Sequence, residues 1–115
     1  MEKRAFIIEM LTKKKTTPFS LLVNGNSMGP NINNNDRILV EPYFGTTLKR
    51  GTIIVYRKFN DHLTVHRIMN VVKISKKRFF CETKGDNNSE IDPYKVFNHE
   101  IIGIVKERNF ENEYD

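Results

Sequence analysis

The chain has a single cysteine, Cys81, so no disulfide can form within it and no cysteine cluster can hold zinc. Packing and backbone hydrogen bonds must therefore stabilise the fold, which suits a reducing compartment. At 115 residues, 38% hydrophobic and 29% charged, the composition is globular and allows one modest core. Because no linker could separate two units, we expect one domain over residues 1–115.

Long apolar runs are also absent. The most apolar N-terminal stretch, Ala5–Ile8, is interrupted by Glu9 and followed only by Met10 and Leu11. This is far short of the roughly 20 apolar residues that a transmembrane helix needs. It also lacks the longer apolar run and the small-residue cleavage site of a secretory signal. We therefore expect no transmembrane segment and, by default, a cytoplasmic location.

Positive charge is in excess, with a formal net charge of +5 and dense basic runs at Lys13–Lys15 and Lys73–Arg78. Solvated turns and helix ends explain such short runs more simply than a nucleic-acid surface, so no nucleic-acid partner is expected.

His62 and His66 are four residues apart in an extended segment, which separates them by roughly 13 Å, too far to bind one ion. We expect neither a metal nor a cofactor.

The hydrophobic pattern predicts one short helix followed by strands. Residues from about 3 to 14 place their apolar side chains on one helical face, which is expected to pack on the domain's own sheet; dimerisation or attachment to a peripheral membrane partner is the alternative. Residues 19–108 are rich in β-branched and aromatic residues between turn signals, and the acidic tail 109–115 is expected to fray. The chain is thus predicted to be a mostly-β domain, with strands at Phe19–Val23, Arg37–Val40, Thr52–Phe59, Leu63–Ile74, Arg78–Thr83 and Ile101–Arg108.

Three segments contain residues suited to nucleophilic catalysis. Ser27 lies in a glycine- and proline-containing turn, where a hydroxyl can be exposed next to backbone N–H groups. His66 lies on a predicted strand, which would fix the position of a general base. A polar loop then contains Asp86 and Asp92, and the proline after Asp92 favours an extended backbone there. Each segment alone has an ordinary structural explanation: a turn serine, a core histidine and a turn aspartate.

The order of these segments is more specific than any one of them. The chain resembles the signal-peptidase and SOS-repressor peptidase superfamily over about residues 20–108. The matching segments, in chain order, are Gly25-x-Ser27-Met28-x-Pro30, Asp36–Val40, Gly51–Tyr56, Val65-His66-Arg67, Lys84–Asn88 and Gly103–Val105. The resemblance implies a signal-peptidase-like β-domain with serine peptidase activity.

The resemblance also indicates a subtype. Bacterial signal peptidases and SOS-repressor peptidases have a lysine base where this chain has His66, whereas the endoplasmic-reticulum and archaeal type uses serine, histidine and aspartate. Similarity to that type implies a triad of Ser27, His66 and Asp92, with Asp86 as a second candidate acid or a support for the loop. Some bacterial enzymes bind the oxyanion with a serine at the position of Gly25. Here backbone N–H groups would do so, that of Ser27 above all, with Gly25, Asn26 and Met28 lining the substrate site.

The predicted function is that of a serine endopeptidase cutting an extended peptide. With no membrane anchor expected, its substrate would be a small precursor or a leader-bearing peptide rather than a secretory protein. Activity should fall in mild acid as the histidine is protonated, whereas a base at Lys58 or Lys84 would give an alkaline profile. The alternative is a catalytically silent peptide-binding or regulatory module of the same fold. A peptide or protein substrate is the expected partner, and the oligomeric state stays open.

Overall fold

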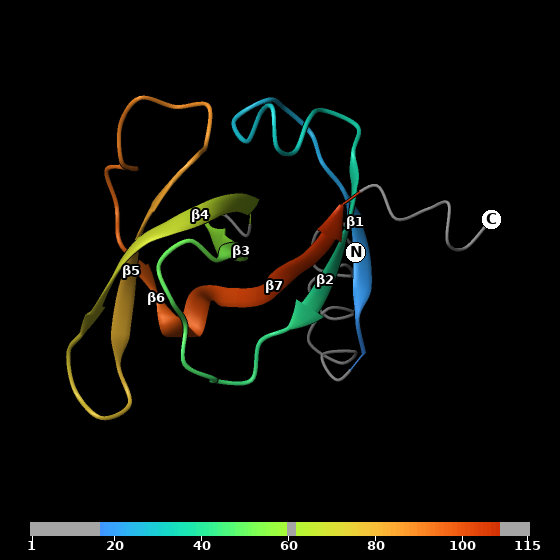
Figure 1. Ribbon diagram of the computed structural model, residues 1–115. Helices are drawn as coiled ribbons and strands as arrows, with labels where there is room; N and C mark the ends of the chain where they lie inside the picture. Colours follow the sequence, from blue (N-terminus) through green and yellow to red (C-terminus); the bar gives the residue numbers. More distant parts are fainter. Residues whose placement is uncertain (1–16, 60–61, 109–115) are drawn as a thin grey trace.

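The computed structural model describes residues 17–59 and 62–108, and these form a single antiparallel sheet (Figure 1). Its seven strands lie in the order β1-β2-β7-β3-β4-β5-β6. The strands are β1 Phe19–Leu22, β2 Arg37–Pro42, β3 Ile53–Lys58, β4 His62–Lys73, β5 Phe79–Lys84, β6 Val96–Phe97 and β7 Ile101–Arg108, with a short 3₁₀ helix, η1, at Asn98–Glu100. The predicted mostly-β domain is confirmed. The predicted helix at 3–14 and the acidic tail at 109–115 lie outside the described residues.

Strand β7 joins the two parts of the sheet, because it pairs with β2 along one edge and with β3 along the other. Figure 1 shows β7 running across the middle, with β4, β5 and β6 on one side and β1 and β2 on the other. The register shifts at Leu39/Val40, at Val55/Tyr56 and at Ile68/Asn70. Such irregularities increase the local bend and twist of a strand, which lets one sheet curl around two separate cores.

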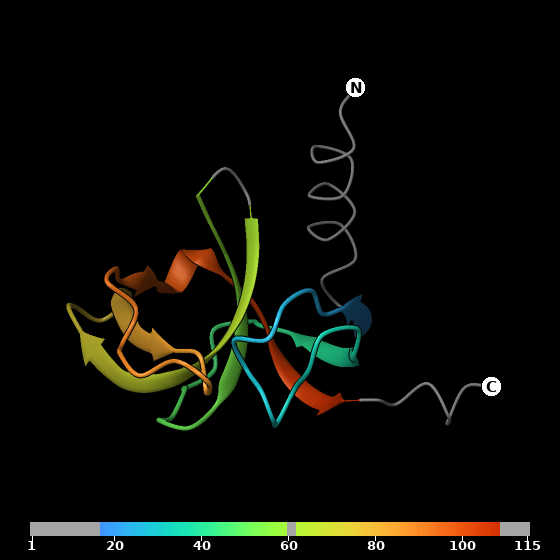
Figure 2. The same ribbon diagram turned by 90° about the horizontal axis from the view of Figure 1, so that it is seen from above.

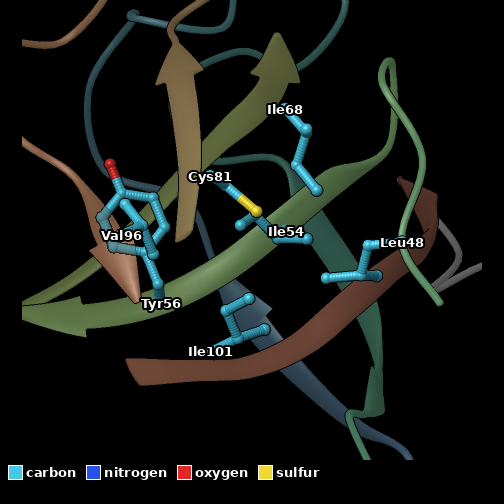
Figure 3. Packing of buried hydrophobic residues seen from close by; sticks show 7 residues of the cluster. All are labelled: Leu48, Ile54, Tyr56, Ile68, Cys81, Val96 and Ile101. Atoms are coloured by element: carbon cyan, nitrogen blue, oxygen red, sulfur yellow. The ribbon is translucent and has the colours of Figure 1, made fainter. Parts of the chain in front are cut away.

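The two cores lie on opposite sides of β3. Ile54 and Tyr56 point into one core, and Val55 points into the other, as the alternation of a strand requires. The first core, here called the Tyr56 core, is shown in Figure 3 and contains Leu48, Ile54, Tyr56, Ile68, Cys81, Val96 and Ile101. The second, the Met28 core, contains Met28, Ile32, Ile38, Val40 and Val55. Each fully buried aliphatic side chain contributes about 1.5–3 kcal/mol.

Within the described ranges, no helix is long and apolar enough to cross a membrane.

Burial raises the pKa of the Cys81 thiol to about 11, so this side chain behaves as a small apolar residue of the Tyr56 core.

Candidate active site

Ser27 lies in the turn that follows β1, and two side chains of this turn are buried in the Met28 core. Met28 and Ile32 are each only 2% exposed, whereas Ser27 is half-buried beside them. Gly25 has a φ of 107°, a conformation that a side chain would strain, and its N–H donates to Asn34 Oδ1 at 2.7 Å. The local sequence thus anchors the turn while leaving the serine hydroxyl accessible.

His66 and Asp92 complete a continuous line of hydrogen-bonding atoms with this hydroxyl. Ser27 Oγ is 3.1 Å from His66 Nε2, and His66 Nδ1 is 2.7 Å from Asp92 Oδ2. His66 is 7% exposed on β4, where it is paired with Ile54 of β3, so its position is set by the sheet. The Asp92 N–H donates to the Thr83 carbonyl at 2.8 Å, which ties the loop that contains Asp92 to β5.

Asp92 also faces three hydroxyl groups that the sequence did not single out. Thr83 Oγ1 donates to Asp92 Oδ2 at 2.7 Å, and Tyr56 OH lies 3.4 Å from the same oxygen. Tyr94 OH is 2.6 Å from Tyr56 OH. Burial raises the pKa of Tyr56 far above its usual range and also raises that of Tyr94, so both phenols stay protonated. The signal in the sequence was a tyrosine at a core position of β3, where a buried hydroxyl needs a partner.

The structure does not place Asp86 on the histidine. Its carboxylate accepts two hydrogen bonds from Arg67, both 2.8 Å long, and a third of 2.8 Å from Asn31 Nδ2. Hydrogen bonds from Arg67 hold the pKa of Asp86 below its ordinary value, and the bond from Asn31 adds to this. Of the two roles expected for Asp86, the geometry corresponds to the support of the loop.

The loop that begins at Gly85 is docked on the serine turn. The Asn87 N–H donates to the Ser27 carbonyl at 2.8 Å, and the Asp86 N–H points to Met28 Sδ at 3.3 Å. Figures 1 and 2 show the serine turn, in cyan, meeting this orange loop. A Cβ on Gly85 would lie 2.6 Å from the Ser27 carbonyl oxygen and 3.1 Å from His66 Nε2. Only glycine allows the loop to approach this closely.

A cleft of about 280 Å³ leads to Ser27. One wall is formed by β1 and the residues after it, Leu21–Asn24, and the other by the start of β4, His62–Val65. Strand β1 is an edge strand of the sheet, and the pairing of β4 with β5 begins only at Arg67. Both walls therefore present a strand edge that no described strand covers over this stretch, and unpaired strand edges can accept a further extended chain.

The remaining predicted site residues have distinct surroundings. Gly25 shapes the serine turn, and Met28 lines the cleft with its side chain otherwise buried. The Asn26 carbonyl accepts from the Asn87 side chain at 3.2 Å, so Asn26 helps to hold the loop. Of the two alternative bases, Lys58 is ion-paired with Glu100 at 2.9 Å and Lys84 donates to the Gly85 carbonyl.

Among the residues that the structure describes, no group of three histidine, cysteine, aspartate or glutamate side chains is arranged to hold a metal ion. A hydroxyl next to an imidazole, which is itself next to a carboxylate, is the arrangement used for nucleophilic acyl transfer.

The comparisons with known proteins agree with the fold and with the expected superfamily. A family model described as Peptidase S24-like matches residues 2–106, which is most of the chain. No curated protein matches the sequence. With a β-domain of the expected architecture and a family match over nearly its whole length, the chain belongs to the Peptidase S24-like family, within the superfamily of LexA-like and signal-peptidase-like serine peptidases.

Proposed function

We propose that this protein is a serine endopeptidase with Ser27 as nucleophile, His66 as general base and Asp92 as the acid that orients His66. The observation that carries the proposal is the line of two contacts, 3.1 Å from Ser27 Oγ to His66 Nε2 and 2.7 Å from His66 Nδ1 to Asp92 Oδ2. Both distances are within the range in which a nucleophile, its base and the group that orients the base act together.

In the proposed mechanism, His66 Nε2 takes the proton of Ser27 Oγ as this oxygen attacks a peptide carbonyl. The carboxylate of Asp92 accepts the Nδ1–H, which fixes the tautomer that leaves Nε2 free and stabilises the imidazolium. His66 then gives the proton to the leaving amine, and water reverses the steps on the acyl-enzyme. Because Gly25 has no hydroxyl, the developing oxyanion is assigned to backbone N–H groups of the serine turn, that of Ser27 first.

The cleft supports an extended peptide as the substrate. A chain entering between β1 and the start of β4 could add as a strand to either exposed edge, with main-chain hydrogen bonds supplying affinity. The side chains of Leu21, Val23, Leu63 and Val65 are among those that line the cleft, so we expect small or medium apolar residues next to the scissile bond. Maturation of a small precursor or a leader-bearing peptide is the process proposed, and a cytoplasmic location stays a prediction.

The histidine also supports assignment to the Ser-His-Asp subtype rather than to the lysine-dependent enzymes. Lys58 and Lys84 have other partners, at Glu100 and at the Gly85 carbonyl, whereas His66 contacts Ser27 directly. His66 rather than a lysine is therefore proposed as the base.

Mass spectrometry of a proteome-derived peptide mixture tests the function. Wild-type protein should generate new peptide termini flanked by small apolar residues, and Ser27→Ala, which keeps the turn and the Met28 core, should generate none. Cleavage that persists in Ser27→Ala would contradict the proposal. Peptide binding by both proteins with cleavage by neither would favour the alternative, a peptide-binding module without catalysis.

A further inference from the structure

The surroundings of Asp92 hold more hydrogen-bond donors than a triad requires. The same oxygen, Oδ2, is approached by His66 Nδ1 and Thr83 Oγ1, each at 2.7 Å, and by Tyr56 OH at 3.4 Å. Tyr94 is linked to the group through its 2.6 Å contact with Tyr56. The three hydroxyl side chains come from three separate segments, β3, β5 and the loop before β6, and His66 comes from β4.

The number of hydroxyl protons on Tyr56 and Tyr94 limits how many hydrogen bonds they can donate to Asp92. A protonated phenol has one proton to donate, and the contact between the two tyrosine oxygens uses only one of the pair's two protons. When Tyr94 donates to Tyr56, the proton of Tyr56 is available to the carboxylate, whose Oδ2 is 3.4 Å away. In that arrangement Tyr56 supplies one donor to Asp92, and Thr83 supplies a second.

The hydroxyl of Tyr56 is not needed for the packing of the core around it. The residue is fully buried in the Tyr56 core, and Figure 3 shows its ring packed among apolar side chains, with the oxygen at the edge of the group. Its ring also meets the His66 ring edge-on, with the centroids 6.4 Å apart. Phenylalanine would fill the same space without a polar atom to satisfy, so packing alone does not call for tyrosine.

Tyr94 links this core to the loop that carries Asp92. It lies two residues after Asp92, and its ring contacts Phe59 edge-on with centroids 5.1 Å apart. Lys58 Nζ lies 5.9 Å from the Tyr94 ring centroid and is paired with Glu100. The phenol is therefore held from the β3 side, and through it so is the backbone that positions Asp92.

We propose that Tyr56, Tyr94 and Thr83 are positioning residues that hold the Asp92 carboxylate against His66 Nδ1. They touch no reacting atom; their effect is to keep His66 in the tautomer that has its proton on Nδ1 and its lone pair on Nε2, facing Ser27. The effect on cleavage rests on the proposed peptidase function, but the effect on the His66 tautomer does not. A platform of three hydroxyls beneath the triad acid is thus part of the site.

The test measures the tautomer directly, by ¹H–¹⁵N NMR of the histidine rings in the full chain at a pH where they are neutral. In the wild type, Nδ1 of His66 should carry the proton. In Tyr56→Phe and in Thr83→Val, its resonance should move toward the average seen when a histidine exchanges freely between tautomers. Tyr43→Phe is the matched control, because Tyr43 packs on the same core but donates its hydroxyl proton to the Thr46 carbonyl at 2.8 Å. Thr83→Ser keeps the donor and should restore the wild-type signal.

Each outcome decides the proposal. Resonances of His66 in Tyr56→Phe that match those of Tyr43→Phe would overturn it, as would a shift toward a more complete Nδ1 proton, because the hydroxyls would then withdraw charge rather than hold the carboxylate. Where a cleavable peptide has been found, kcat for Tyr56→Phe should fall about tenfold with little change in KM. If the variants shift the tautomer but the wild type cleaves no peptide, the positioning role stands and the peptidase assignment is removed. Tyr56→Phe is used because phenylalanine fills the same buried space without a polar atom to satisfy.

Discussion

The candidate triad draws its members from two regions that are built in different ways. The nucleophile region comprises β1, β2 and the turn at 23–36, and it presents Ser27 on an irregular backbone over the Met28 core. The base region comprises β4, β5, β6 and the loop at 85–95, and it presents His66 on a twelve-residue strand over the Tyr56 core. His66, the proposed base, is fixed by regular strand pairing, whereas Ser27, the proposed nucleophile, is fixed by the hydrogen bonds of its turn and by two anchoring side chains.

What aligns the two regions is a short loop rather than the sheet. The segment from Gly85 to Asn88 belongs to the base region, yet Asn87 binds the Ser27 carbonyl and Asp86 joins Arg67 to Asn31 of the serine turn. The 3.1 Å contact between Ser27 and His66 therefore depends on this loop as well as on the two cores. Substitutions that act on the base, on the loop and away from both should differ in their effects by orders of magnitude.

The largest effect is expected at the base itself. His66→Ala removes the proton acceptor, and general acid–base assistance contributes about 10²–10⁴-fold, so kcat should fall by about that factor. Steady-state cleavage of a peptide found in the mass-spectrometric screen measures it. His99→Ala, in η1 and outside the residues that line the cleft, is the control and should keep the activity. Activity that survives in His66→Ala would rule out His66 as the base.

A smaller but still large effect is expected where the two regions touch. Gly85→Ala would insert a methyl group 2.6 Å from the Ser27 carbonyl oxygen and 3.1 Å from His66 Nε2, so the serine turn and the histidine must separate. Displacing catalytic groups by about 1 Å can cost on the order of 10²-fold in rate, and we expect a loss of that size in kcat/KM.

Gly45→Ala gives a matched comparison for this experiment. Gly45 has a φ of 93° with nothing within 4 Å of an added Cβ, so alanine there strains the backbone by about 1–2 kcal/mol without a clash. That variant should be less stable yet fully active. Equal losses of activity in the two variants would show that destabilisation, and not misalignment, explains the result for Gly85.

The longer strands could be predicted from the sequence, whereas the shortest elements could not. All six predicted strands exist, because alternating β-branched and aromatic residues between turn signals reflect the pleat directly. Strand β6 and helix η1 were not predicted, since Val96–Phe97 and Asn98–Glu100 are too short to show any period. For the site, chain order and family resemblance selected Ser27, His66 and Asp92, which the structure brings together.

The parts of the site that the sequence did not reveal depend on contacts between distant segments. Thr83, Tyr56 and Tyr94 become neighbours of Asp92 only after β3, β5 and the loop have been placed, and the only local signal among them is a tyrosine at a core position of β3. Asp86 could not be separated from Asp92 as the acid until Arg67 was seen to occupy its carboxylate. The sequence also does not show that Gly85 allows its loop to approach the Ser27 carbonyl closely.

A moderate effect, on stability more than on chemistry, is expected from the ion pair that braces the loop. Asp86→Asn removes the charge-assisted bonds from Arg67 and should lower the free energy of unfolding at pH 7 by about 1–3 kcal/mol. Arg67 holds the pKa of Asp86 below its ordinary value, so the contribution is fully present above about pH 4 and is lost as the pH falls through the lowered pKa of the folded state. Urea unfolding at pH 7, 5 and 3 should show the difference between the two proteins shrinking only at the lowest pH. A difference that is already absent at pH 7 would show that the pair does not stabilise the loop.

The smallest effect is expected from a charge pair that lies outside the contact between the regions. Lys106 Nζ is 3.4 Å from Glu41 Oε1, across β7 and β2, and both side chains are more than half exposed, at 53% and 54%. Exposed pairs of this kind contribute about 0–1 kcal/mol, so Lys106→Ala should change the free energy of unfolding by less than about 1 kcal/mol and leave kcat/KM unchanged. The same urea unfolding and peptide-cleavage assays measure both quantities, at low and at physiological salt. A clear fall in kcat/KM that vanishes at higher salt would mean that positive charge on this face attracts the substrate through long-range electrostatics. Residues far from the loop would then also contribute to activity.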